Sequence, residues 1–190
     1  MHLPWRDVPA GLASPLISTS LTAAESNRLA GLADGRDVLE IGSAYGYSAC
    51  LMALAGAKHV TAVDPHTWLG SHEAMLSNLD KAGVAGQVTI VRDASPAALD
   101  GLGPFGLVFI DGDHGAEAVA ADVAAARAVL ADGGVLACHD YGETCCCPGV
   151  RQAMDILFPD GPSEHIDTLA IYNEPNGRQE TNSGTGQDLH

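Results

Sequence analysis

Acidic and histidine side chains follow two apolar segments in the second half of the chain. The run Asp111-Gly-Asp-His114 comes directly after the segment Leu107–Ile110, and His139-Asp140 comes directly after Val135–Cys138. If both segments are neighbouring parallel strands, their carboxyl ends bring these side chains together at one edge of a sheet. Carboxylate oxygens and an imidazole could then hold one divalent cation, which would lower the pKa of a bound hydroxyl group and orient it. His114 is near enough to act as a general base, since histidine has an ordinary pKa of about 6.5.

An earlier glycine-containing turn has residues suited to hold a ligand. Glu40-Ile-Gly-Ser-Ala-Tyr-Gly46 has the spacing E-x-G-x-x-x-G, and such glycines let the backbone turn sharply and approach a ligand closely. The segment that follows is expected to be a helix, whose first turn has free N–H groups. The pattern differs from the G-x-G-x-x-G of dinucleotide-binding turns, which place a pyrophosphate against the helix. An acid here suits a ligand with an ammonium group and hydroxyls, and S-adenosylmethionine (SAM) has both.

Two further acidic positions follow this turn at suitable distances. Asp64 ends the apolar segment His59–Val63, and a carboxylate about 20 residues after a glycine loop can accept both hydroxyl hydrogens of a ribose. Asp93-Ala-Ser95 follows the next apolar segment and is placed to contact an adenine ring. A tight strand-to-helix turn without a ligand would also explain the glycines, and an Asp at a strand end often forms a turn. The residues expected to bind the cofactor are Glu40, Gly42, Ser43, Gly46, Tyr47, Ser48, Asp64, Asp93, Ala94, Ser95 and Asp111.

The elements that must position these residues alternate along the chain. Thr22-Ala-Ala-Glu25 is a capping-box pattern and predicts the start of a helix. Short apolar strands alternating with helices predict an α/β fold: a Rossmann-like, doubly wound and mainly parallel sheet, with helices on both faces and an abbreviated C-terminal strand pair. Strands are expected at residues 38–41, 59–63, 88–91, 107–110, 135–138 and 166–172, the last being the one clear strand of the C-terminal pair. Helices are expected from Thr22 and at 46–55, 71–82, 95–99, 115–130 and 149–157, with 115–130 stopping at Asp132-Gly-Gly134.

Composition and charge limit the partners of the protein. The chain has 190 residues, with 9 Lys and Arg against 24 Asp and Glu, and a formal net charge of −15. This balance argues against non-specific nucleic-acid binding and against docking on anionic membranes, because both need a cationic surface. We expect residues 1–21 to form an N-terminal arm, residues 22–172 one domain, and residues 173–190 a disordered polar tail. The start of the chain lacks the pattern of a signal peptide, and no apolar stretch reaches about 18 residues, so we expect a cytoplasmic protein.

Five cysteines are present, at Cys50, Cys138 and the adjacent Cys145, Cys146 and Cys147. Adjacent cysteines rarely pair with each other, so the pattern does not predict the disulfide framework of a secreted protein. The chain also lacks two matching CxxC pairs, and we therefore expect no structural zinc site. We interpret the adjacent cysteines as part of a loop that flanks the substrate mouth.

The run Val38–Ala49 resembles the SAM-binding loop of class I SAM-dependent methyltransferases. It is most similar to the catechol O-methyltransferase type and to related antibiotic and macrolide-sugar O-methyltransferases, and the resemblance covers roughly residues 22–172. In that family the acid on the first strand, here Glu40, and the glycine loop hold the methionine part of SAM. The resemblance further implies that Asp64 holds the ribose and that Ala94-Ser95 lies beside the adenine.

The same resemblance implies a metal site and a base. Enzymes of the catechol type bind a metal through an acid after the fourth strand and an adjacent pair after the fifth, which correspond to Asp111, His139 and Asp140. Their general base corresponds to His114, and Asp113 is then a neighbour of the site rather than a ligand. The family usually has an acid where this chain has His139, so we expect Mg²⁺ or Mn²⁺, with Zn²⁺ or Fe²⁺ as the alternatives that an imidazole favours. The other interpretation is a metal-free site, in which Asp111 caps a helix and His139 is a hydrogen-bonded core residue.

These expectations combine into one predicted activity. The chain is expected to be a SAM-dependent O-methyltransferase that acts on a hydroxyl of a small molecule, such as a phenol, a catechol or a sugar-bearing natural product. The segments that close the substrate side in this family are short here, so the site is either open or closed by a second subunit of a homodimer. The alternatives are a metal-independent small-molecule methyltransferase, a SAM-binding accessory protein without methyl transfer, and a nicotinamide-dependent oxidoreductase. The E-x-G-x-x-x-G loop argues against the last of these.

Overall fold

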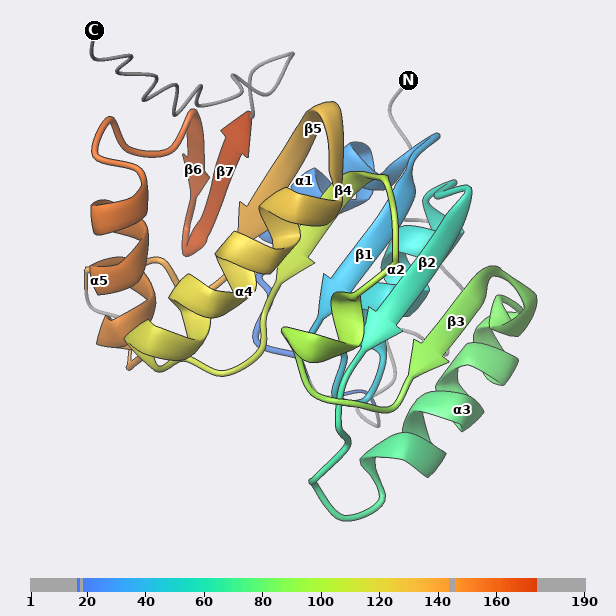
Figure 1. The fold of residues 1–190 in the computed structure, drawn as a ribbon. Coiled ribbons are helices and arrows are strands. Elements are labelled where there is room, and N and C mark those ends of the chain that lie inside the picture. Colours follow the sequence, from blue (N-terminus) through green and yellow to red (C-terminus); the bar gives the residue numbers. More distant parts are fainter. Residues whose placement is uncertain (1–16, 18, 144–145, 174–190) are drawn as a thin grey trace, which may run out of the picture.

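Strands and helices alternate along the chain as the apolar segments predict (Figure 1). The computed structural model describes residues 17, 19–143 and 146–173, so the predicted arm at 1–21 and tail at 173–190 lie almost wholly outside the described residues. The strands are β1 (Asp37–Ile41), β2 (His59–Val63), β3 (Val88–Val91), β4 (Phe105–Ile110), β5 (Leu130–Cys138), β6 (Glu164–Ile166) and β7 (Leu169–Asn173). The helices are α1 (Ala23–Ala33), α2 (Tyr47–Leu54), α3 (Ser71–Ala82), α4 (Ala116–Val129) and α5 (Pro148–Leu157), with the short 3-10 helices η2 (Ala85–Gln87) and η3 (Ala97–Leu99).

The strands of the described residues form one sheet, in the order β3-β2-β1-β4-β5-β7-β6. Strands β1 to β5 run parallel, whereas β7 runs antiparallel to β5, and β6 antiparallel to β7. The strand order changes direction between β1 and β4. Doubly wound sheets bind their ligands at that place, beyond the carboxyl ends of the strands. The predicted Rossmann-like α/β fold is therefore confirmed, and it locates the region in which a ligand site is expected.

Helices cover both faces of the sheet. Apolar side chains of α1, α2 and α3, among them Leu29, Met52 and Met75, pack on one face. Helices α4 and α5 pack on the other face through side chains such as Val123 and Met154. In Figure 1, α1 and α2 lie behind the sheet and α4 lies in front of it. Because the central strands are covered on both faces, they consist of nearly continuous apolar runs, which is why the sequence predicts them well.

Two predicted boundaries are wrong. Helix α4 ends at Val129 and β5 begins at Leu130, so Asp132-Gly-Gly134 lies inside the strand rather than after the helix. A register shift against β4 accommodates these residues, as in a β-bulge. The single strand expected at 166–172 is a hairpin of β6 and β7, because Asp167 has a φ of 52° and turns the chain between them.

The parallel register brings four candidate residues to the same edge of the sheet. The amides of Gly42, Asp64, Asp111 and His139 each donate a hydrogen bond to a carbonyl of the neighbouring strand, at 2.9, 3.1, 2.8 and 3.0 Å. Each residue follows directly after its strand, so the ladder of hydrogen bonds continues one position past β1, β2, β4 and β5. These backbone hydrogen bonds therefore hold the four residues in a regularly spaced row along the edge of the sheet.

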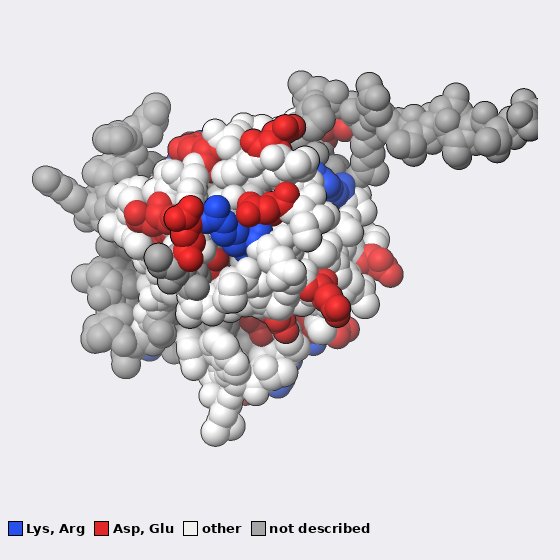
Figure 2. All heavy atoms as spheres, turned by 90° about the vertical axis from the view of Figure 1, so that its left-hand side faces the viewer, with Lys and Arg blue, Asp and Glu red and all other residues white. Residues whose placement is uncertain are grey.

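Acidic side chains surround basic ones on the face of the molecule that carries α5 (Figure 2). Arg151 of this helix lies 3.3 Å from both Glu143 and Asp155. Neighbouring carboxylates therefore balance the charge of Arg151, and this residue does not give the face a cationic patch for an anionic partner. No helix in the described part of the chain is both long enough and apolar enough to cross a membrane.

Candidate functional site

A pocket of about 510 Å³ opens beyond the carboxyl ends of the parallel strands. Its wall consists of the loops after β1, β2, β3 and β4, together with residues of α4. Five of the predicted cofactor-binding residues line it: Gly42, Asp64, Ala94, Ser95 and Asp111. Sites that hold small molecules and cofactors span roughly 300–1,000 Å³. The fold thus brings these five residues together around one cavity of suitable size.

The glycine turn after β1 is required by packing. Gly42 has a φ of +90°, and a Cβ at this position would lie 2.2 Å from the carbonyl oxygen of Asp111. Gly46 has a φ of +82°, and its Cβ would lie 2.7 Å from Cγ of Met75. Glycine satisfies both conditions because it has no Cβ and adopts positive φ without penalty. The two glycines therefore have a structural role whether or not a ligand binds: Gly42 allows the loop to pass close to the end of β4, and Gly46 allows it to pass close to α3.

Asp64 joins the loops that follow β1 and β2. Its Oδ2 accepts a hydrogen bond from the N–H of Ala44 at 2.8 Å, and its Oδ1 accepts one from the N–H of His66 at 2.6 Å. Ala44 and His66 have positive φ angles of 44° and 50°, and strained backbone of this kind clusters at binding sites. The Asp64 side chain is 15% exposed and lines the pocket. A carboxylate has about four acceptor positions, so Asp64 can accept further hydrogen bonds from a ligand.

Glu40 and Ser48 lie behind the glycine loop rather than in the wall of the pocket. The Ser48 hydroxyl donates a hydrogen bond to Oε1 of Glu40, while Oε2 is buried without a hydrogen-bond partner among the described residues. Burial raises the pKa of Glu40 to about 8, against the lowering effect of the Ser48 hydrogen bond. Glu40 is therefore mostly neutral at pH 7, and its contact with a ligand remains a prediction.

Four other predicted cofactor residues stand outside the pocket wall: Ser43, Gly46, Tyr47 and Asp93. Ser43 is buried, and its hydroxyl has no partner within the described ranges of the chain. Asp93 is exposed, and its Oδ1 accepts a hydrogen bond from the N–H of Ala94 at 2.8 Å. This turn shapes the loop that presents Ala94 to the pocket. A direct role of these four residues in ligand binding also remains a prediction.

Asp111, His139 and Asp140 come together beyond the ends of β4 and β5. Nδ1 of His139 lies 3.1 Å from Oδ1 of Asp111 and 3.6 Å from Oδ2 of Asp140. Donor atoms of the three residues all lie within 4.8 Å of one another. Asp140 has a φ of 61°, so the chain leaves β5 through a sharp bend. The structure thus brings together the three predicted metal ligands.

His139 is buried between acidic groups on both sides of its ring. Its side chain is 1% exposed, and its Nε2 lies 3.5 Å from Oε2 of Glu25 and 3.2 Å from Oγ1 of Thr168. Burial alone would lower the pKa of His139, but the hydrogen bonds to Asp111 and Asp140 and the charges of these residues raise it to about 10. Such a ring is an imidazolium at neutral pH. It can bind a metal only after it loses a proton.

The chemistry of this donor set is compatible with a divalent cation. An imidazole nitrogen and two carboxylates suit Mn²⁺, Fe²⁺ or Zn²⁺, whereas Mg²⁺ prefers oxygen ligands alone. Nδ1 of His139 already faces both carboxylates, so deprotonation at this atom would complete the set without a change of ring orientation. The residues therefore fit a metal, with the proton of His139 as its competitor.

His114 lines the pocket beside this cluster. Its Nε2 lies 3.0 Å from Oδ2 of Asp140, and its Nδ1 lies 3.2 Å from Sγ of Cys147. The side chain is 43% exposed, so a small molecule in the pocket can reach the ring. An imidazole that a carboxylate orients at one nitrogen can accept a proton at the other.

The comparison with known families places the chain. The family described as a methyltransferase domain matches residues 39–141. The chain belongs to this methyltransferase family. The match begins within β1 and ends just after β5, so it covers most of β1, all of the other parallel strands and the residues at their carboxyl ends. The sequence resemblance to class I methyltransferases is confirmed.

Solved structures share the fold of the methyltransferase over most of its length. The cofactor-bound protein Rv0187 from MTB is similar with a TM-score of 0.67 and 26% identity, over 85% of each chain. The O-methyltransferase TomG from Streptomyces achromogenes gives 0.62 and 21% over 81% of each chain. An O-methyltransferase from Bacillus cereus gives 0.64 and 17% over 87% of each chain. A comparison with curated proteins finds no match.

Three residues lie at the site of the methyltransferase although the sequence did not assign them to it. Asp122 of α4 is buried and lines the pocket, and burial raises its pKa against a hydrogen bond with Ser95. Glu25 caps α1 as predicted, but its Oε1 also accepts hydrogen bonds from the N–H and hydroxyl of Thr168, at 2.7 and 2.8 Å. Cys147 contacts the predicted base. An acid in an otherwise alanine-rich helix is a signal that could have found Asp122, whereas Glu25 and Cys147 reach the site only through the tertiary fold.

Proposed function

We propose that the protein is a SAM-dependent O-methyltransferase that methylates a hydroxyl group of a small molecule. The observation that carries this proposal is the position of His114: a half-exposed imidazole, oriented by Asp140, lines the same pocket as Asp64 and Asp111. A methyl donor and a base that activates the acceptor can therefore share one cavity. The acidic surface supports a small acceptor rather than a nucleic acid. A phenol, a catechol or a sugar-bearing natural product has the required hydroxyl.

The pocket has a suitable residue for each part of SAM. Asp64 would accept hydrogen bonds from the ribose hydroxyls, Ala94 and Ser95 would lie beside the adenine, and the loop at Gly42 together with Asp111 would hold the methionine part. TomG was crystallised with SAM and the Bacillus cereus enzyme with S-adenosylhomocysteine (SAH), which supports this ligand for the shared fold. When bound, SAM supplies an electrophilic methyl group on a positively charged sulfur.

His114 would take the proton of the acceptor hydroxyl. If Nε2–H donates to Asp140, the proton acceptor is Nδ1, which in the free protein lies next to Sγ of Cys147. An acceptor hydroxyl would displace the thiol from this nitrogen. The carboxylate of Asp140 then stabilises the imidazolium that forms. The walls of the pocket position the acceptor oxygen in line with the methyl group, and such positioning supplies much of the rate acceleration of a two-substrate reaction.

Asp111, His139 and Asp140 would hold a divalent metal at the acceptor side of the pocket. A metal there supplies Lewis acidity, which lowers the pKa of the acceptor hydroxyl and fixes its orientation. A second candidate is a metal-independent methyltransferase, because a protonated Nδ1 of His139 can donate a hydrogen bond to Asp111 at 3.1 Å. In that case the buried imidazolium itself balances one of the two charges of Asp111 and Asp140. We further propose a cytoplasmic location and a homodimer whose second subunit closes the acceptor side.

The test is methyl transfer from SAM to a panel of phenols, catechols and sugar-bearing compounds, with SAH binding followed by calorimetry. His114→Ala is expected to keep the affinity for SAH and to lower kcat by about 100-fold or more, the usual contribution of a general base. His59→Ala is the matched control, because His59 begins β2 at the opposite edge of the sheet. EDTA followed by Mn²⁺ decides between the two candidates, since the metal-independent enzyme keeps its rate throughout. SAH binding without turnover on any acceptor would indicate an accessory protein, and absence of SAH binding would contradict the proposal.

A further inference from the structure

We propose that Cys147, His114 and Asp140 form a second metal site, suited to a thiophilic divalent cation such as Zn²⁺. Donor atoms of these three side chains all lie within 4.8 Å of one another. Sγ of Cys147 lies 3.2 Å from Nδ1 of His114, the nitrogen that would bind the ion. Oδ2 of Asp140 lies 3.0 Å from the other ring nitrogen, Nε2, so this carboxylate has to turn toward Nδ1 before it can bind the same ion. The three residues come from separate segments, after β4, after β5 and at the start of α5, so their convergence is a product of the tertiary fold.

The distances match the size of a zinc site. A tetrahedral Zn²⁺ ion bonds to sulfur at about 2.3 Å and to nitrogen at about 2.0 Å, which places the two donors roughly 3.5 Å apart. The observed distance of 3.2 Å between Sγ of Cys147 and Nδ1 of His114 is close to this value. The donor atoms of the three residues lie within 4.8 Å of one another, so side-chain rotations have to bring the Asp140 carboxylate closer to complete the set around one ion.

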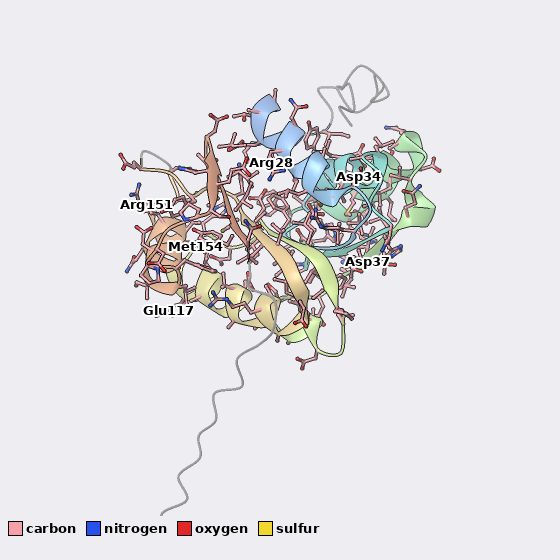
Figure 3. All side chains as sticks on the ribbon, turned by 90° about the horizontal axis from the view of Figure 1, so that it is seen from above. Arg28, Asp34, Asp37, Glu117, Arg151 and Met154 are labelled. Atoms are coloured by element: carbon pink, nitrogen blue, oxygen red, sulfur yellow. The ribbon has the colours of Figure 1, made fainter. Side chains whose placement is uncertain are left out.

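The packing of α5 holds the thiol at this place. Cys147 stands directly before the first turn of α5, with Pro148 at its start. A Cβ on Gly149 would lie 2.4 Å from the carbonyl oxygen of His114, so only glycine allows the helix to approach this loop so closely. Met154 of α5 is fully buried, whereas Arg151 lies at the outer edge of the same helix (Figure 3). The helix is therefore anchored to the core, and Cys147 has a fixed position beside His114.

The donor types separate this site from its neighbour. Thiolate and imidazole ligands select Zn²⁺ and other soft ions, whereas the cluster of Asp111, His139 and Asp140 contains no sulfur. Asp140 belongs to both clusters, so its carboxylate can serve one ion or bridge two. From the sequence we interpret the adjacent cysteines as part of a loop that flanks the substrate mouth. In the structure one cysteine of the run, Cys147, meets donors from two other segments.

Occupancy of this site would have a consequence for the reaction. An ion bound to Nδ1 of His114 takes the lone pair that would accept the proton of the acceptor hydroxyl. Zn²⁺ would then inhibit methyl transfer, and this consequence rests on the proposed function. The metal site itself does not depend on it, so binding can be tested without turnover.

The experiment is a Co²⁺ titration of the reduced full-length protein, followed by absorption spectroscopy. A cobalt–thiolate bond gives an intense charge-transfer band in the near ultraviolet, which oxygen and nitrogen ligands do not give. We expect this band to rise to one equivalent and to disappear on addition of Zn²⁺. Cys147→Ser should abolish the band. Cys146→Ser is the matched control and should keep it, because the exposed Cys146 lies 3.4 Å from Sγ of Cys147 but outside the donor cluster.

Two results would overturn the proposal: no thiolate band in the parent protein, or a band of equal intensity in Cys147→Ser. Thermal unfolding followed by circular dichroism establishes that each variant is folded. SAH titration of the same samples keeps the two proposals apart, because a protein that binds SAH without a thiolate band contradicts only the second metal site. A thiolate band without SAH binding contradicts only the proposed function.

Discussion

Replacement of the buried Glu40 by glutamine tests the electrostatics beneath the glycine loop. The carboxyl group of Glu40 is fully buried, accepts one hydrogen bond from Ser48 and leaves Oε2 without a partner among the described residues. Burial raises its pKa from the ordinary 4.5 to about 8. Glu40→Gln keeps the shape and the acceptor for Ser48 but removes the titrating proton. The variant therefore isolates the cost of holding an acid in this place.

The sign and size of the effect follow from these two pKa values. Between pH 4.5 and 8 the unfolded chain has an ionised Glu40, whereas the folded chain keeps it protonated, so folding takes up a proton. The free energy of unfolding of the parent protein must then fall as the pH rises through this window. At about 1.36 kcal/mol for each pH unit, the full loss is about 5 kcal/mol. At pH 7 about 3 kcal/mol of it is already present, and Glu40→Gln should be more stable than the parent by that order.

Urea unfolding at a series of pH values from 4.5 to 8.5 gives the required free energies by linear extrapolation. The quantity of interest is the difference between Glu40→Gln and the parent, because other titrating groups cancel in it. Asp37→Asn, at the exposed start of the same strand, is the matched control for loss of an acid from β1. A difference between Glu40→Gln and the parent that stays constant from pH 4.5 to 8 would refute the reasoning, since it would mean that Glu40 titrates alike in both states.

Two further predictions concern the wall of the pocket. Gly42→Ala forces a Cβ to within 2.2 Å of the carbonyl oxygen of Asp111 at a φ of +90° and should destabilise the protein by about 3 kcal/mol or more in urea unfolding. Gly31→Ala, in the exposed part of α1 with no atom within 4 Å of the new Cβ, should instead stabilise it by about 0.5–1 kcal/mol; equal effects would contradict the packing argument. Asp64→Asn removes the charge that faces the proposed ribose position and should weaken SAH binding by about 10- to 100-fold, at roughly 1.5–3 kcal/mol for hydrogen bonds to a charged group. Unchanged affinity in calorimetry would mean that Asp64 serves only to hold Ala44.

The sheet and the row of residues at its carboxyl edge could be predicted because both signals are local. Leu107–Ile110 and Val135–Cys138 are apolar throughout, as strands covered on both faces must be. Once these strands are parallel neighbours, the residues directly after them must meet. This geometric rule needs no knowledge of side-chain packing, and it brought Asp111 and the His139-Asp140 pair together. The division of 166–172 into two strands was not predicted, because the turn between them depends on one positive φ, at Asp167, that the sequence does not reveal.

Contacts between distant segments could not be predicted in this way. Glu25 has a complete local explanation as a helix cap, and the hydrogen bonds to Thr22 confirm it. Nothing in this pattern reveals that the same carboxylate meets Thr168, 143 residues away. Cys147 is similar, because its neighbour is fixed by the close approach of α5 to the loop after β4, and this approach depends on Gly149. Glu25 and Cys147 therefore contact the site through tertiary packing that their local sequence does not indicate.

The surroundings of His139 show why the presence of a metal is a question of charge as well as of ligand geometry. Three carboxyl groups, from Glu25, Asp111 and Asp140, lie within 3.6 Å of its ring, which as an imidazolium provides a single positive charge. Burial raises the pKa of Glu25, but its hydrogen bonds with Thr22 and Thr168 and the charge of His139 lower it overall, so this group stays ionised. If all three carboxyls are ionised, two negative charges remain unbalanced at a largely buried place. A divalent cation that replaces the Nδ1 proton adds two positive charges and removes one. One negative charge, rather than two, then remains unbalanced. The electrostatics of the site therefore favour the exchange of proton for metal, and increasingly so as the pH rises toward the pKa of His139.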